Sequence, residues 1–281
     1  PTRARKRLDR STLSLILDSG VFMINAVVLS GGSAYGLAAS DGVMKCLEEH
    51  GIGYNTGYAL VPLVCQSCIF DLGYGKSNVR PDVNMGYDAC QKALEGCDLS
   101  MGNVGAGTGA SVGKLLGMKQ AMKAGLGIHA IQVGELKIGA VVVVNAFGDI
   151  FNPETGQKIA GLMDSTRSTF LDLEQMFLHF MSAPKDLFNS NTTIGCVITN
   201  AKFDKAKLNK IAAMTRNAYA RCINPVGTMA DGDSIYACSV GEVVSDVNLV
   251  GTLSAKVMQK AILKAVESAK IPDEEYLLHC L

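Results

Sequence analysis

The sequence has no tryptophan and no excess of charge of either sign. Its 281 residues include 26 Lys and Arg against 26 Asp and Glu, so no overall electric field favours nucleic acid or an acidic partner. Its apolar stretches are interrupted before they reach the roughly 18 residues that identify a membrane-spanning helix. We therefore expect neither nucleic acid nor a membrane as a partner.

Recognisable metal and redox motifs are also scarce. The four histidines show no zinc spacing, and the nine cysteines are scattered mostly through apolar segments. An odd cysteine count without a secretory signal is typical of reduced thiols in the cytoplasm, where a buried cysteine packs as a small hydrophobe. Cys65 and Cys68 form a close pair, but neither a helix start nor a second pair follows them. We expect a cytoplasmic protein with no metal and no cofactor.

What the sequence does contain is apolar residues and glycine. Hydrophobic residues make up 48% of the chain, and most of the 30 glycines lie beside apolar runs. This composition is typical of a large core with tight turns between strands and helices, and we expect one α/β domain over residues 1–281. Apolar periodicity predicts helices over 11–18, 34–50, 81–94, 204–222 and 249–269. It predicts strands over 24–29, 61–70, 125–133, 137–145 and 234–240. Residues 152–190 are expected to form a mobile, exposed connector.

The most informative segment begins at Asn191-Thr192-Thr193 and continues as a run of β-branched residues typical of a buried strand. An internal threonine hydroxyl is a poor nucleophile. If the peptide bond before Thr192 is cut, the freed α-amine provides an intramolecular base with an ordinary pKa near ~8. A polar turn that leads into a strand is the simpler interpretation. Self-cleavage between Asn191 and Thr192 is the functional hypothesis.

The glycine-rich segment over 102–114 resembles a phosphate-binding loop only superficially. A Walker loop requires glycine at the position of Thr108 and serine or threonine at the position of Leu115. The glycines are better explained by close approach of backbone to another chain segment. Lys114 is then a cation anchored at a helix start.

Two further groups of polar residues can support chemistry. Asp231-Gly232-Asp233 can bind calcium, remain solvated or hold a catalytic amine, although calcium usually needs more oxygen ligands than this segment supplies. Asn145 ends an apolar strand, so its amide is either a turn former or a donor directed at a reacting oxygen.

Six segments in order resemble the P1-type N-terminal-nucleophile amidohydrolases, peptidase family S58. This family includes L-aminopeptidase/D-amidase-esterases, β-peptidyl aminopeptidases and 6-aminohexanoate-oligomer hydrolases. The matching segments are Val27-Val28-Leu29-Ser30-Gly31-Gly32-Ser33-Ala34-Tyr35-Gly36-Leu37, Arg80-Pro81-Asp82, Gly105-Ala106-Gly107-Thr108-Gly109-Ala110, Val144-Asn145-Ala146-Phe147-Gly148-Asp149, Asn191-Thr192-Thr193 and Asp231-Gly232-Asp233.

The resemblance implies a role for each matching residue. Thr192 falls on the nucleophile, released by cleavage after Asn191 into chains of residues 1–191 and 192–281. Asp231 and Asp233 fall on the acidic pair that orients the nucleophile. Lys114 falls on a site lysine, and Asn145 falls on the donor to the tetrahedral oxyanion. The implied fold is a four-layer αββα sandwich similar to that of ornithine acetyltransferases, in homo-oligomers of four or more subunits.

The resemblance also leaves alternatives open. The expected activity is hydrolysis of amide bonds in small peptides or amino-acid amides. Transfer of the acyl group to an amino acid, as in ornithine acetyltransferases, is an alternative. Other members have N-terminal strands before the position of Pro1, so an inactive structural or binding descendant is a further one. Some members also place tyrosine at the position of Phe70, which leaves more of the oxyanion stabilisation to Asn145 and to backbone N–H groups.

Overall fold

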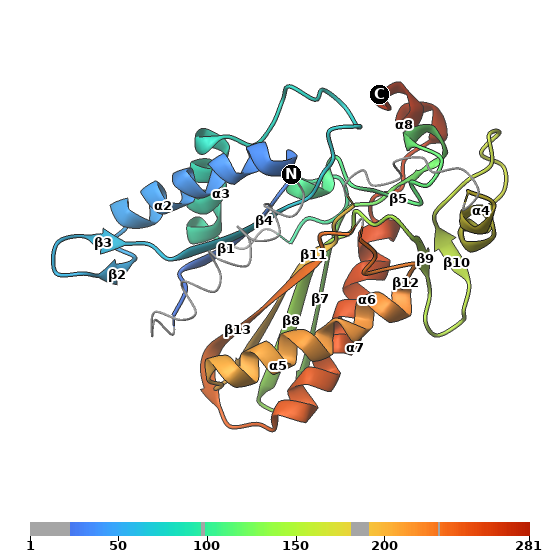
Figure 1. Cartoon of the computed structure of the whole chain (residues 1–281). Coiled ribbons are helices and arrows are strands. Elements are labelled where there is room, and N and C mark those ends of the chain that lie inside the picture. Colours follow the sequence, from blue (N-terminus) through green and yellow to red (C-terminus); the bar gives the residue numbers. More distant parts are fainter. Residues whose placement is uncertain (1–22, 97–98, 181–190, 230) are drawn as a thin grey trace.

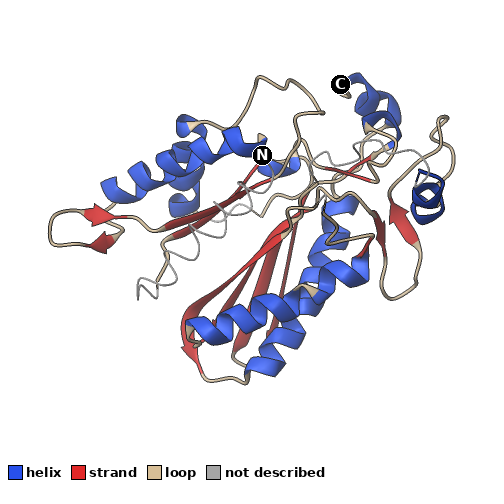
Figure 2. Cartoon of the chain, in the orientation of Figure 1, coloured by secondary structure: helices blue, strands red, loops and turns tan. Residues whose placement is uncertain are grey.

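The computed structural model describes residues 23–96, 99–180, 191–229 and 231–281 (Figures 1 and 2). Its helices are η1 (Ser33–Ala38), α2 (Ala39–Glu49), α3 (Val83–Glu95), η2 (Gly105–Gly107), η3 (Met118–Gln120), α4 (Leu173–Phe180), α5 (Lys205–Thr215), α6 (Asn217–Cys222), α7 (Val247–Glu267) and α8 (Asp273–Leu278). The long strands are β1 (Ala26–Ser30), β4 (Val64–Cys68), β7 (Leu126–Val133), β8 (Leu136–Val143), β11 (Ile194–Ala201) and β13 (Ser234–Val243). The short strands are β2 (Tyr54–Asn55), β3 (Leu60–Val61), β5 (Ser111–Val112), β6 (Met122–Lys123), β9 (Asp149–Phe151), β10 (Lys158–Ala160) and β12 (Ile223–Asn224).

A four-stranded sheet with the order β13-β11-β8-β7 organises the molecule. Strands β7 and β8 correspond to the strands predicted over 125–133 and 137–145, and they form an antiparallel hairpin whose turn places Gly134 at a φ of 59°. Strand β11 pairs antiparallel with β8 and parallel with β13. Because parallel neighbours point the same way, the residues before β11 and before β13 meet at one end of the sheet.

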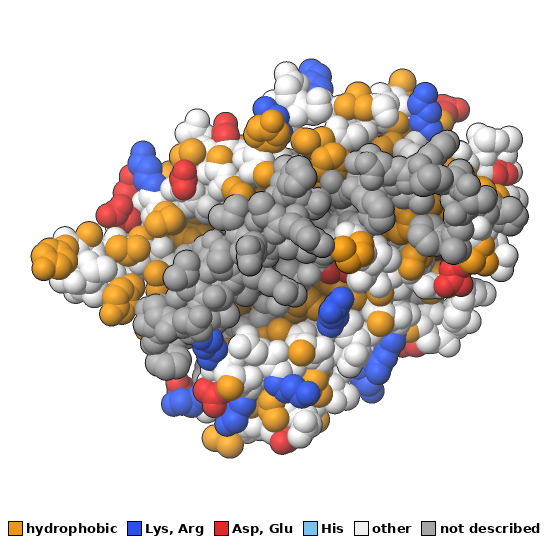
Figure 3. All heavy atoms as spheres, viewed as in Figure 1, with side chains coloured by type: hydrophobic (Ala, Val, Ile, Leu, Met, Phe, Trp, Pro, Cys, Tyr) orange, Lys and Arg blue, Asp and Glu red, His pale blue; other side chains and the backbone are white. Residues whose placement is uncertain are grey.

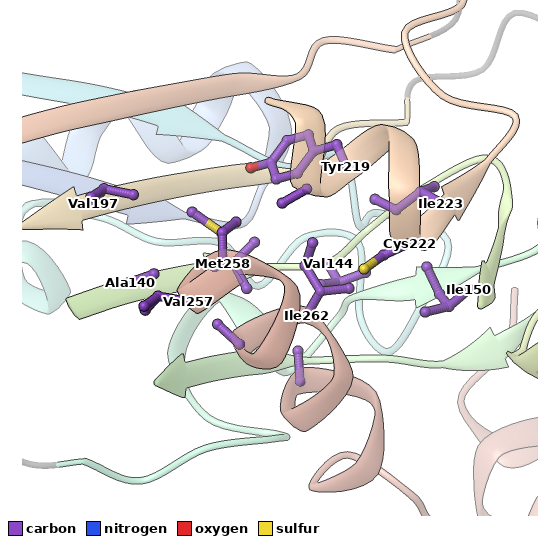
Figure 4. Packing of buried hydrophobic residues seen from close by; sticks show 14 of the residues in the cluster. Ala140, Val144, Ile150, Val197, Tyr219, Cys222, Ile223, Val257, Met258 and Ile262 are labelled. Carbon is purple, nitrogen blue, oxygen red and sulfur yellow. The ribbon is translucent and has the colours of Figure 1, made fainter. Parts of the chain in front are cut away.

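The main core lies between this sheet and the helices on one of its faces. Helix α7 packs on β7 and β8, and α5 packs on β13. Figure 4 shows buried side chains of α7, α6 and the sheet converging here, among them Val144, Val197, Tyr219 and Met258. Removing this apolar surface from water is the main stabilising contribution to such a layer, at roughly 25 cal/mol per Å².

The other face of the sheet meets a smaller layer built from β1 and β4, which pair in parallel. Helix α2 packs on these strands and on α3. Hydroxyl groups connect the two sheets, since Ser67 of β4 lies 2.7 Å from the Tyr236 oxygen and accepts a hydrogen bond from Ser234. The hairpin β2–β3 projects away from this layer (Figure 1), and hydrophobic side chains lie on the surface at that end of the molecule (Figure 3). Tyr58 in the turn of the hairpin is fully exposed.

Aspartates mark the helix starts well. Asp82 caps α3, Asp204 caps α5 and Asp246 caps α7, each by accepting a hydrogen bond from a backbone N–H of the first turn. The prediction of one helix over 204–222 is wrong, because the helix breaks between α5 and α6. The Thr215 hydroxyl donates 2.8 Å to the Ile211 carbonyl, a contact that typically bends a helix.

The described part of the predicted connector is exposed only in part. Strand β10 pairs with β9, and Leu162 and Leu173 are 0% and 1% exposed in a cluster with Phe147 and Leu115. Apolar residues at these positions bury themselves against the sheet end, so the prediction of exposure is wrong for residues 160–163 and for Leu173, whereas residues 153–157 and 168–170 are exposed. Residues 181–190 and the predicted helix over 11–18 lie outside the described residues. No helix in the described ranges is long and apolar enough to cross a bilayer.

Candidate functional site

The candidate site forms where the chain enters β11 and β13. Asn191 and Asp231 form a parallel bridge, which extends the pairing of these two strands. The Gly232 N–H donates 2.8 Å to the Asn191 carbonyl, and the Ser234 N–H donates 3.1 Å to the Thr193 carbonyl. The strand pairing thus places the Asn191–Thr192 peptide beside the acidic segment, although about 40 residues separate them in sequence.

A second set of contacts joins Thr192 to Asn145. The Thr192 N–H donates 3.0 Å to the Asn145 carbonyl oxygen. Lys114 Nζ donates to the same carbonyl at 3.2 Å and to Asn145 Oδ1 at 2.8 Å. The nitrogen of Thr192 and the amine of Lys114 therefore share one acceptor. Cutting the peptide before Thr192 would create an α-amine close to the lysine.

The Asn145 side chain is fully buried, and its orientation is determined by its partners. Its Oδ1 accepts from Lys114 and, at 3.1 Å, from the Ser111 N–H. Its Nδ2 donates 2.9 Å to the Phe70 carbonyl. An amide nitrogen carries two N–H groups, so this contact occupies one of them. Phe70 lacks a hydroxyl group but holds the asparagine through its backbone.

The two acidic residues have different partners. Asp231 is 6% exposed, and its Oδ2 accepts from the N–H and the hydroxyl of Thr228, both at 2.8 Å. Asp233 Oδ1 accepts from the Thr193 N–H at 2.7 Å. Asp231 thus stabilises its own turn, while Asp233 holds the residue directly after Thr192.

Lys114 lies in the loop after β5, so the prediction that it begins a helix is wrong. Its N–H donates instead to the Phe147 carbonyl at 3.2 Å, which joins this loop to the segment between β8 and β9. Burial lowers the pKa of Lys114 from 10.5 to about 7, against the opposing effect of Asp231 and Asp71. The glycine-rich segment does bring backbones close together, as predicted, since a Cβ on Gly107 or Gly113 would overlap neighbouring backbone atoms.

This lowered pKa predicts a stability change with pH. Between the folded pKa near 7 and the unfolded pKa of 10.5, the unfolded chain binds more protons at Lys114, so stability rises with pH. The contribution between pH 7 and 8 is about 1 kcal/mol. In urea unfolding of the uncut Thr192→Ala chain, Lys114→Met should reduce the rise by that amount. Lys123 contributes with the same sign, so part of the rise remains. The exposed control Lys210→Met should retain the full rise, and an equal rise in both variants would contradict the assignment.

Two charged residues near the site are not apparent from the sequence. Lys123 is 6% exposed, and burial lowers its pKa to about 7 despite the opposing charge of Asp71. Burial raises the pKa of Asp71, whose Oδ1 accepts 2.7 Å from the Gly32 N–H. The sequence offered one signal, because Ala121-Met122-Lys123-Ala124 places a single charge between apolar residues.

Cys65 and Cys68 do not form a common site. Both lie on β4, and three residues along a strand place side chains on opposite faces. Cys68 Sγ lies 3.0 Å from the Ser30 hydroxyl, whereas Cys65 lies near Cys238. Across the described ranges, no group of three or more histidine, cysteine, aspartate or glutamate side chains is arranged to hold a metal ion.

The family and the relatives that the chain matches identify it as a hydrolase of peptide bonds. The chain belongs to peptidase family S58, whose family model matches residues 10–272. It is 36% identical over 273 residues to an uncharacterized aminopeptidase of Mycobacterium tuberculosis, an alignment that covers 90% of this chain and 76% of the relative. It is 29% identical over 282 residues to the 6-aminohexanoate-oligomer endohydrolase of an Agromyces species, with 94% and 78% of the two chains covered.

A solved structure shows the same fold at low sequence identity. The L-aminopeptidase D-Ala-esterase/amidase of Ochrobactrum anthropi superposes with a TM-score of 0.53 at 17% identity. The match covers 85% of this chain and 64% of that protein, which is described as a variant of the Ntn hydrolase fold. The expected α/β class with an N-terminal-nucleophile-like fold is confirmed at this level.

Proposed function

We propose that this chain is a self-processing amidohydrolase whose nucleophile is Thr192. The observation that carries the proposal is the set of three hydrogen bonds around the Asn191–Thr192 peptide. The Asn191 carbonyl accepts from Gly232, the Thr192 N–H donates to Asn145, and the Thr193 N–H donates to Asp233. The partners come from two segments distant in the sequence, Asn145 after β8 and the acidic segment before β13, and one of them is the Asp233 side chain.

Self-cleavage begins when Thr192 Oγ1 attacks the Asn191 carbonyl carbon. The Gly232 N–H is already 2.8 Å from the carbonyl oxygen, where negative charge develops, so it stabilises the tetrahedral intermediate. The C–N bond then breaks, the hydroxyl proton passes to the departing amine, and an ester joins Asn191 to Thr192 Oγ1. Water hydrolyses the ester, leaving chains of residues 1–191 and 192–281.

Turnover uses the group that cleavage has released. The Thr192 α-amine takes the proton of Oγ1 as the hydroxyl attacks a substrate amide. The Asn145 carbonyl oxygen accepts from this nitrogen and from Lys114 Nζ, which keeps the amine beside the attacking hydroxyl. The second N–H of Asn145 Nδ2 donates to the substrate oxyanion. The substrate C–N bond breaks as the Thr192 α-amine passes the proton to the departing amine, and water then hydrolyses the ester between the acyl group and Oγ1.

The proposed substrates are small peptides or amino-acid amides. The relatives described as an aminopeptidase and as a 6-aminohexanoate-oligomer endohydrolase are named for hydrolysis of the same type of bond, an amide. Thr192 is partly exposed and Gly232 beside it is exposed, so substrate has access to the nucleophile. The packing of α2 on β1–β4, and of α5 and α7 on the four-stranded sheet, supports a four-layer αββα arrangement of one domain similar to ornithine acetyltransferases. We also propose that the protein forms homo-oligomers of four or more subunits.

The proposal is tested by the mass of the purified protein. Intact mass spectrometry after incubation at neutral pH is expected to show two polypeptides, with the smaller one beginning at Thr192. Hydrolysis of a panel of aminoacyl anilides and ω-amino-acid oligomers is expected to appear with the same time course. A chain that stays whole would contradict self-cleavage, and acyl transfer to an added amino acid in excess of hydrolysis would favour the acyltransferase.

The space beside Thr192 is limited, so we expect Gly232→Ala to slow self-cleavage. A Cβ at this position would lie 3.0 Å from Thr192 Oγ1 and 3.5 Å from Thr192 Cγ2, so the hydroxyl must shift by a few tenths of an ångström. Because attack geometry is sensitive to such shifts, we expect self-cleavage to slow by about tenfold. Gly96→Ala is the matched control, since its Cβ meets nothing within 4 Å and its φ of 173° suits alanine. Equal cleavage rates on a timed denaturing gel would rule out the crowding.

A further inference from the structure

The environment of Lys123 is unusual for a residue outside the proposed catalytic set. Its ammonium donates to the carbonyls of Gly107 at 2.8 Å, Ala110 at 3.0 Å and Ala124 at 2.5 Å. An ammonium has three N–H donors, so all of them are used. The Tyr74 ring centroid lies 5.4 Å away. An apolar side chain could fill this space without the desolvation cost of a buried charge. We therefore expect the three carbonyls that Lys123 fixes to have a function.

One of these carbonyls belongs to a peptide that contacts Asn145. The Ala110 carbonyl and the Ser111 N–H are two ends of one planar peptide group, and they point in opposite directions. Lys123 holds the carbonyl end, and the N–H end donates 3.1 Å to Asn145 Oδ1. Fixing the carbonyl therefore fixes the direction of the N–H that orients the asparagine.

Asp71 belongs to the peptide group that contacts the nitrogen of the Asn145 amide. The Phe70 carbonyl accepts from Asn145 Nδ2, and the N–H of the same peptide belongs to Asp71. The Asp71 carboxylate is held by the Gly32 N–H at 2.7 Å and accepts from its own backbone N–H. Anchoring this carboxylate fixes the Phe70–Asp71 peptide and the carbonyl that it presents.

The two charged residues also act on one loop. Gly109 directly precedes Ala110, and a Cβ on Gly109 or on Gly31 would overlap the Asp71 carboxylate. The carboxylate thus fills the space between these two backbones. Asp71 contacts the loop at Gly109, while Lys123 holds it at Gly107 and Ala110.

We propose that Lys123 and Asp71 are positioning residues, which orient the Asn145 amide by fixing the peptide groups on either side of it. This inference rests on the proposed function of Asn145 as the oxyanion donor. Neither residue needs to touch the substrate. We therefore expect each residue to affect the rate of the chemical step through Asn145 and to have little effect on substrate binding.

Lys123→Met and Asp71→Asn test the proposal. Each is expected to lower kcat for an anilide substrate by about tenfold to a hundredfold and to leave KM unchanged, because a misplacement near 1 Å costs about that much. In the Asn145→Ala background, the same substitutions are expected to lower kcat by less than about twofold, because the group they position is gone. A merely structural role would reduce kcat in both backgrounds alike.

Arg167→Met is the matched control. Arg167 is also a buried cation, and it donates 2.8 Å to the Lys119 carbonyl and 2.7 Å to the Ala121 carbonyl, away from the loop that contacts Asn145. It is expected to lower thermal stability while kcat of the folded protein stays within about twofold. Circular dichroism establishes folding, and if Lys123→Met does not fold, the cycle of Asp71→Asn with Asn145→Ala decides.

The outcomes separate the two proposals. If the wild type cleaves itself and hydrolyses amides while folded Asp71→Asn and Lys123→Met have wild-type kcat, the positioning role is overturned and the proposed function stands. Equal losses in the wild-type and Asn145→Ala backgrounds overturn it as well. A wild type that neither cleaves itself nor hydrolyses amides overturns both proposals.

Discussion

Thr192→Ala is expected to give a single uncut polypeptide with no amidase activity. The substitution removes the hydroxyl that we propose attacks the Asn191 carbonyl, so we expect that no new N-terminus forms and no base is released. Denaturing gels and intact mass report cleavage, and release of aniline from an anilide substrate reports turnover. We expect both to fall below detection. Cleavage in the folded Thr192→Ala chain would remove the basis of the mechanism.

Two substitutions serve as controls for this result. Thr192→Ser keeps a hydroxyl and is expected to retain cleavage and turnover at reduced rates. Thr193→Val keeps the shape of the next side chain, whose hydroxyl is buried and has no hydrogen-bond partner among the described residues. Because the Thr193 backbone N–H still reaches Asp233, Thr193→Val is expected to cleave normally. Loss of cleavage in Thr193→Val would show that the gel reports the local fold rather than the nucleophile.

Asn145→Ala is expected to lower kcat by about 10² to 10³, the usual cost of one oxyanion donor. The variant keeps the Asn145 backbone carbonyl, so the contact with the Thr192 nitrogen remains. The fold is expected to persist but to lose about 1–3 kcal/mol, because Lys114, Ser111 and Phe70 lose a buried partner. Steady-state kinetics and urea unfolding of the uncut form measure the two effects separately.

The matched control for this loss is Asn200→Ala. The Asn200 amide also bridges two backbone groups, the Lys137 N–H at 2.7 Å and the Glu135 carbonyl at 2.8 Å, but at the opposite end of β11. It is expected to cost stability and leave kcat nearly unchanged. A similar fall in kcat for both variants would mean that sheet stability, rather than oxyanion stabilisation, sets the rate.

The sequence predicted those parts of the fold whose signals are local. Gly134 marks the turn of the β7–β8 hairpin, and Asp82 and Asp204 mark helix starts, because their backbone and capping preferences act within a few residues. The break between α5 and α6 was missed because apolar periodicity continues across it. The burial of Leu162 and Leu173 was missed because polar residues dilute the apolar pattern around them.

The candidate site also combines residues that the sequence indicates with residues that only the folded structure reveals. Thr192, Asp231 and Asp233 stand out as polar groups at strand starts, and Asn145 stands out at a strand end, so their proximity follows once the strand order is known. Asp71 carries no local signal, and the only signal for Lys123 is a single charge between apolar residues, which does not indicate what it contacts. Their significance depends on which carbonyls and amides of distant loops surround them, and that arrangement exists only in the folded chain.

The order of strands in the central sheet has a consequence for the processed protein. Strand β8 lies before residue 191 and β11 after it, and the two pair directly from Ile194 opposite Val143 to Thr199 opposite Ile138. A cut before Thr192 therefore leaves Asn145 on one polypeptide and the threonine on the other, joined through the middle of the sheet. Unfolding such a protein separates two polypeptides, and forming the site again then requires that the two polypeptides meet in solution.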